Sequence, residues 1–176
     1  MSLAETIAQL GGRSAVEQVA KQFGLPSSVT SQAVGMLLPS LSAGIAKNTQ
    51  KEGGLGSLLS ALASGNHSQY LEEPETLAAT STTEDGNNIL GHVLGGKDAS
   101  RAVASTVAGV LGIENDTVKK MLPVVAALAM GGLAKQAKSA GLSKESASGS
   151  GATDVLGQLA GMIDVKDAAS ILGKLF

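Results

Sequence analysis

Two stripes of apolar residues, half the chain length apart, constrain the fold most strongly. In each stripe an apolar side chain recurs every three or four positions. The first stripe is Val29, Ala33, Leu37, Leu41 and Ile45, and the second is Val118, Leu122, Val125, Ala129 and Leu133. Side chains at this spacing lie on one face of an α-helix. Each stripe therefore predicts a long helix that packs along one side.

The rest of the two halves also corresponds. An offset of 88 residues, half of the 176-residue length, aligns apolar, glycine and lysine positions in the same order over about 30 residues. The aligned pairs include Val19 with Val107, Ala20 with Ala108, Gly24 with Gly112, Ile45 with Leu133 and Lys47 with Lys135. This correspondence indicates a duplicated helical unit.

A glycine separates two predicted helices in each half of the chain. Gly24 and Gly112 each stand between two helical patterns, where a tight turn would bring the helices together as a helix-turn-helix corner. Patterns typical of strands are nearly absent. We predict an all-α fold built from two pseudo-repeated multi-helix units.

The chain divides at a polar stretch. Residues 1–71 form the first predicted unit, residues 72–84 a linker, and residues 85–176 the second unit. The two units either share one core or form two domains.

The composition of the chain excludes several classes of functional site. The chain is 43% hydrophobic but has only three aromatic residues, and it contains neither cysteine nor tryptophan. A disulfide framework, a cysteine-ligated metal and a thiol nucleophile are therefore excluded. No glycine pair is followed by the Lys-Ser/Thr of a nucleotide-binding loop, and no serine lies in a Gly-x-Ser-x-Gly elbow. We expect no cofactor, no metal and no enzymatic activity.

One polar segment remains a candidate functional site. It contains Asp85, Asn87 and His92, which could act together as a metal site or as a general base if they converge in one pocket. The structural interpretation makes Asp85 the N-cap of a helix and His92 an ordinary helical side chain. A small metal- or ligand-binding enzyme is one alternative function.

DNA binding is the second alternative. Lys119 and Lys120 could form a basic face beyond the second corner, but Glu114 and Asp116 at the start of that helix would repel phosphate. The formal net charge of −2 also argues against a broad basic surface. We therefore expect no nucleic-acid partner.

The chain is predicted to be cytoplasmic and without a membrane span. Its beginning lacks the basic start and apolar core of a secretory signal. The longest apolar stretches, 33–46 and 121–134, fall short of the ~20 residues that a span needs, and each contains proline.

Several motifs resemble a known family. The segment Asp85-Gly-Asn-Asn-Ile-Leu-Gly-His-Val-Leu-Gly95, together with Lys120-Met-Leu-Pro123 and Met36-Leu-Leu-Pro39, is similar to the bacterial domain of unknown function 937 in the YidB-like group. The resemblance implies an all-helical fold that has been described as homeodomain-like, and it supplies no catalytic residues.

These observations lead to a functional hypothesis. We expect a bacterial, non-enzymatic module that binds a protein partner or self-associates, because the shortage of charge leaves apolar helix faces for an interface. The candidate interaction face consists of Leu37, Leu41, Ile45, Leu122, Ala129 and Leu133.

Overall fold

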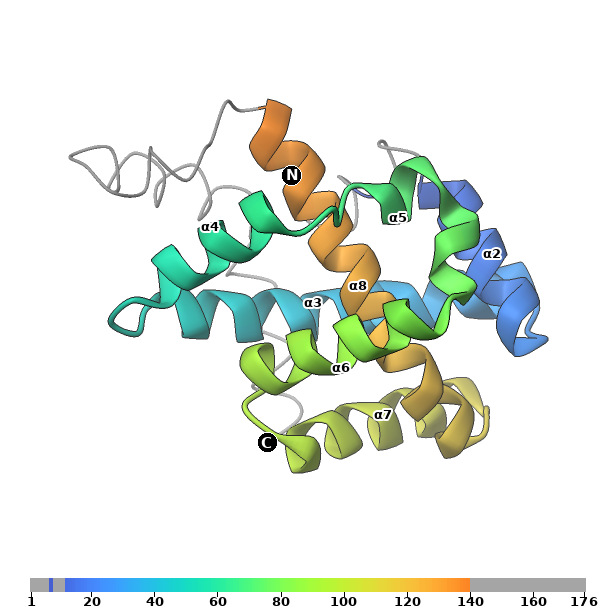
Figure 1. Ribbon diagram of the computed structural model, residues 1–176. Coiled ribbons are helices and arrows are strands. Elements are labelled where there is room, and N and C mark those ends of the chain that lie inside the picture. Colours follow the sequence, from blue (N-terminus) through green and yellow to red (C-terminus); the bar gives the residue numbers. More distant parts are fainter. Residues whose placement is uncertain (1–6, 8–11, 140–176) are drawn as a thin grey trace.

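The computed structural model describes residue 7 and residues 12–139, and within that part of the chain every regular element is a helix (Figure 1). The elements are α2 (Arg13–Phe23), α3 (Ser27–Thr49), α4 (Gly54–Ser64), α5 (Gln69–Glu72), the 3-10 helix η2 (Pro74–Ala78), α6 (Thr80–Val93), α7 (Lys97–Leu111) and α8 (Asn115–Ser139). The all-α prediction is confirmed.

Helix α8 is the central element of the fold. It crosses α6 and also packs against α7 and α3 (Figure 1). Every residue from Met121 to Ala134 is buried, on all sides of the helix. Because a solvent-facing helix has only one apolar stripe, burial all round is typical of a core helix.

The two predicted corners have the same backbone geometry. Gly24 ends α2 with φ 64° and ψ 30°, and Gly112 ends α7 with φ 67° and ψ 30°. In each corner the N–H after the glycine donates to the carbonyl five residues earlier, over 3.0 Å in the first and 3.2 Å in the second. This left-handed glycine cap closes a helix and turns the chain into the next one.

The segment predicted as a linker is folded. Residues 72–84 contain η2 and the first turn of α6, and the fully buried Leu77 of η2 belongs to the core, where η2 packs against α2. The predicted boundary at residue 85 falls inside α6. Residues 140–176 of the predicted second unit lie outside the described residues.

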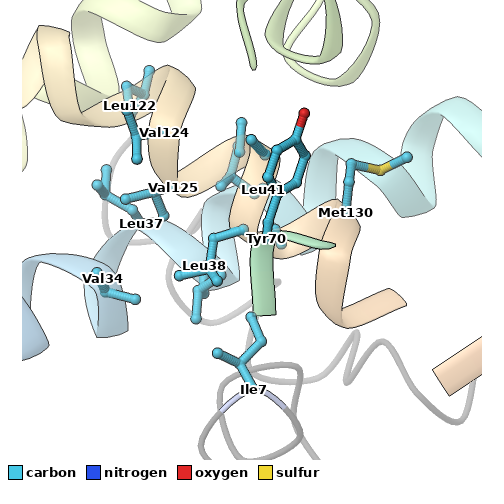
Figure 2. Close-up of a cluster of buried hydrophobic side chains, with 14 of the residues drawn as sticks. Ile7, Val34, Leu37, Leu38, Leu41, Tyr70, Leu122, Val124, Val125 and Met130 are labelled. Atoms are coloured by element: carbon cyan, nitrogen blue, oxygen red, sulfur yellow. The ribbon is translucent and has the colours of Figure 1, made fainter. Parts of the chain in front are cut away.

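One hydrophobic core contains side chains from both predicted units. It joins the buried face of α3 to the buried length of α8, with the ring of Tyr70 among them (Figure 2). The two predicted units therefore share a core over the part of the chain that the structure describes.

Two of the described helices are long and apolar enough to cross a membrane by length and composition alone. In α8, 83% of the apolar window is buried inside the fold, and in α3 56% is buried. Core helices of a folded chain satisfy the same criteria.

Candidate functional site

Asp85 lies inside α6 and contacts the turn before α5. Its Oδ2 accepts a hydrogen bond of 2.8 Å from the phenol of Tyr70 and lies 3.5 Å from Nδ1 of His67. The residue that precedes α6 is Ala79, so the prediction that Asp85 caps a helix is wrong. The carboxylate instead links α6 to α5.

His67 and Tyr70 are held in place by close contact with α8. Both residues are buried, and their rings are 6.0 Å apart between centroids. A Cβ placed on Gly131 would lie 2.7 Å from the carbonyl oxygen of His67 and 3.3 Å from Cβ of Tyr70. Only glycine permits this approach of α8 to the turn before α5.

A second polar link lies beside the first. Lys138, near the end of α8, donates to the hydroxyl of the buried Ser68 over 2.9 Å. We call the five residues His67, Ser68, Tyr70, Asp85 and Lys138 the polar latch, because they join the turn before α5 to α6 and to α8.

The phenol of Tyr70, one of the residues of the polar latch, has a raised pKa. Burial raises the pKa of Tyr70 to about 12, and the hydrogen bond to Asp85 adds to the increase because a carboxylate acceptor favours the protonated phenol. Figure 2 shows the ring of Tyr70 in the core, with its oxygen pointing away from Leu38 and Ile7. The phenol of Tyr70 therefore stays protonated at neutral pH and donates its hydrogen bond to the carboxylate of Asp85.

The three predicted site residues do not converge. Asn87 and His92 are exposed, whereas Asp85 faces the latch. Asn87 follows Asp85 by two positions, and such residues point to different sides of a helix. Among residues 7 and 12–139, no group of three or more His, Asp or Glu side chains could hold a metal ion. The arrangement required by the metal-site alternative is thus not formed by these residues.

Two hollows border α7, on different sides of that helix. The α6–α7–α8 cleft has a volume of about 580 Å³ and is lined by Asn87, Leu90, Gly91, Gly96, Lys97, Ser100, Arg101, Lys119 and Leu122. The α3–α7 groove has a volume of about 240 Å³ and is lined mainly by small or apolar side chains. Its residues are Ser40, Ala43, Gly44, Lys47, Val93, Leu94, Ala99, Ala102, Val103 and Thr106.

The outward side of α7 is exposed and uncharged. The exposed residues of α7 after Arg101 are Ala102, Ser105, Gly109 and Val110, and no charged residue follows Arg101 before Glu114. Val110 is 65% exposed, the one large hydrophobic side chain so exposed among the described residues. We call Ala99, Ala102, Thr106, Gly109 and Val110 the α7 outer face.

The predicted interaction face is not available to a partner. All six residues are between 0% and 2% exposed, and they belong to the core between α3 and α8. These residues are Leu37, Leu41, Ile45, Leu122, Ala129 and Leu133. The sequence did indicate the exposed surface, since no charged residue occurs between Arg101 and Glu114 on either side of α7.

The start of α8 keeps its acidic character. Lys119 donates to Asp116 over 3.0 Å, and this hydrogen bond holds the pKa of the exposed Asp116 carboxyl below its usual range. Glu114 and Lys120 are both exposed nearby. Acidic groups therefore stand where a DNA-reading helix would offer donors to phosphate.

Comparison with known proteins identifies the family. The chain belongs to the bacterial proteins of unknown function grouped as DUF937, whose family model matches residues 5–136. No curated protein and no solved structure matches the chain.

Proposed function

We propose that the protein is a non-enzymatic assembly module that forms a homodimer through the α7 outer face. The observation that carries this proposal is Val110, a large apolar side chain exposed one turn beyond an apolar groove on the same helix. One surface thus offers both a projection and a hollow. A two-fold interface needs such self-complementarity, because each copy presents the same patch.

An antiparallel pairing of two α7 helices matches the shape of this face to itself. If the two-fold axis passes between residues 105 and 106, Val110 of one copy falls beside Ala99 and Ala102 of the other, as a knob enters a hole. Between Arg101 and Glu114 the chain carries no charged residue, so the centre of this interface is free of charge.

The size of the contact limits its strength. Helix α7 has 15 residues, which at about 1.5 Å per residue gives a length of about 22 Å. An interface built mainly on one helix of this length belongs to the small, transient class, below about 1,200 Å². We therefore expect a monomer–dimer equilibrium that depends on concentration.

Analytical ultracentrifugation across micromolar to millimolar concentrations tests the proposal. We expect the wild type to dimerise and Val110→Lys to remain monomeric, because an unpaired ammonium would be buried against apolar side chains. Ala102→Glu should also abolish self-association. An equimolar mixture of the two variants should restore a dimer, since the ammonium introduced at position 110 of one chain would face the carboxylate introduced at position 102 of the other.

Gln32→Lys is the matched control. It adds the same charge at an exposed position of α3, away from α7, and should leave dimerisation unchanged. Circular dichroism should show all variants folded. A wild type that stays monomeric at every concentration, or variants that dimerise as the wild type does, would overturn the proposal.

We also propose that the fold contains two copies of one helix-turn-helix unit of the homeodomain-like kind. Support comes from the aligned ends of the helices: α2 and α7 end 88 residues apart, at Phe23 and Leu111, and α3 and α8 begin 88 residues apart, at Ser27 and Asn115. The matching glycine caps add to this support.

A further inference from the structure

We propose that the α6–α7–α8 cleft binds a small ligand that carries phosphate groups. The cleft is separate from the α7 outer face, so this inference does not depend on the proposed dimer. Lys97, Arg101 and Lys119 line it, and no carboxylate of the described residues lines it. Three cationic residues from two helices line one concavity, and such a lining favours an oxyanion ligand.

Neutral hydrogen-bond donors add to the three cations. The side-chain amide of Asn87 lines the cleft from α6, and Gly96 and Lys97 bring the N-terminus of α7 to its wall. No side chain caps that terminus, so its first backbone N–H groups have no side-chain acceptor. A phosphate oxygen can accept hydrogen bonds from amides and guanidinium together.

Two acidic residues stand beside the cleft without lining it. Asp98 lies 3.4 Å from Arg101, and Asp116 lies 3.0 Å from Lys119, in each case as an exposed pair on a single helix. Exposed ion pairs of this kind contribute little to the stability of the fold. A dianionic ligand that enters the cleft can therefore draw both cations away from their partners.

The size of the cleft favours a small molecule over a polymer. Its volume of about 580 Å³ lies within the range of small-molecule sites. A long polyanion such as duplex DNA would extend past the rim toward Glu114 and Asp116, where like charges repel it. A compact phosphate compound avoids that repulsion.

Titration of the full chain with pyrophosphate tests the inference, with calorimetry to measure affinity and amide chemical shifts to locate the site. We expect saturable binding, with shifts confined to residues around the cleft. Arg101→Gln and Lys119→Gln should each weaken binding by about tenfold, the loss expected for one charged hydrogen bond. Asn87→Asp, which adds a carboxylate to the wall, should abolish it.

Lys120→Gln is the matched control. It removes the same charge as Lys119→Gln one position further along α8, from a side chain that does not line the cleft. We expect it to bind pyrophosphate like the wild type. Equal weakening in both variants, or the absence of saturable binding, would overturn the inference. Tighter binding of duplex DNA than of pyrophosphate, sensitive to both lysines, would also overturn it in favour of a polymer site.

Discussion

Gly86 of α6 lies directly against the backbone of Pro123 in α8. A Cβ placed on Gly86 would overlap the carbonyl oxygen and Cα of Pro123, which are backbone atoms that cannot rotate away. Among the described elements, α6 and α8 share the most extensive helix contact. Their separation is therefore set by the absence of one side chain.

Substitution of that glycine should loosen the fold. We expect Gly86→Ala to lower the free energy of unfolding by about 1–3 kcal/mol, the range for overpacking a tight contact. Urea denaturation, monitored by circular dichroism, measures this loss of unfolding free energy. Gly91→Ala, on the same helix where a Cβ meets no atom within 4 Å, should instead stabilise by up to about 1 kcal/mol through helix propensity. Equal effects would contradict the contact at Pro123.

Substitution of either corner glycine by alanine should cost the same folding free energy. Gly24 and Gly112 adopt φ of 64° and 67°, so an alanine at either position should cost about 1–2 kcal/mol of folding free energy. Thermal and urea unfolding of both variants measure this cost. Gly35→Ala, within α3 with open space around its Cβ, is the control and should not destabilise. A large cost at only one corner would weaken the case for two matching units.

The single tyrosine provides a direct optical probe of the polar latch. Tyr70 is the only tyrosine in the sequence, so phenolate absorbance reports its ionisation alone. We expect a midpoint near pH 12 in the folded chain and near 10 in urea. Asp85→Asn should lower the folded midpoint, while burial keeps it above that of the unfolded chain.

The raised pKa of Tyr70 also predicts how the stability of the fold changes with pH. The folded pKa lies above the unfolded value, so the folded state holds a proton that the unfolded state loses between pH 10 and 12. The contribution of Tyr70 is complete below pH 10 and falls as pH rises through this window. Denaturation midpoints of the wild type should therefore fall more steeply there than those of Tyr70→Phe. If the denaturation midpoints of the wild type and of Tyr70→Phe fall equally between pH 10 and 12, this role of the phenol is contradicted.

The helices could be predicted from the sequence because their causes are local. The spacing of Leu37, Leu41 and Ile45, and the position of Gly24, depend only on helix geometry and on the steric freedom of glycine. Which side of each helix meets a partner depends on the whole fold. For that reason the stripe chosen as an interaction face is the interior of the molecule.

The site was harder to predict because its contacts are distant in sequence. Asp85 meets Tyr70 across 15 positions, and a polar residue before an apolar run has the same appearance as a helix cap. Leu77 stands alone within a polar stretch, so its burial in the core left no periodic pattern. Asn87 lines the α6–α7–α8 cleft, but the basic residues around it come from α7 and α8, so no local pattern in the sequence joins them.

The complete burial of α8 affects how the chain can fold during synthesis. Without α8, residues 12–114 would expose the surfaces of α3, α6 and α7 that pack against it. At about 5–20 residues per second, translation of the 25-residue helix takes roughly 1–5 s. Throughout that interval the emerging chain exposes the surface that α8 will cover. Native structure can therefore form only after α8 is synthesised, and until then we expect the nascent chain to bind chaperones.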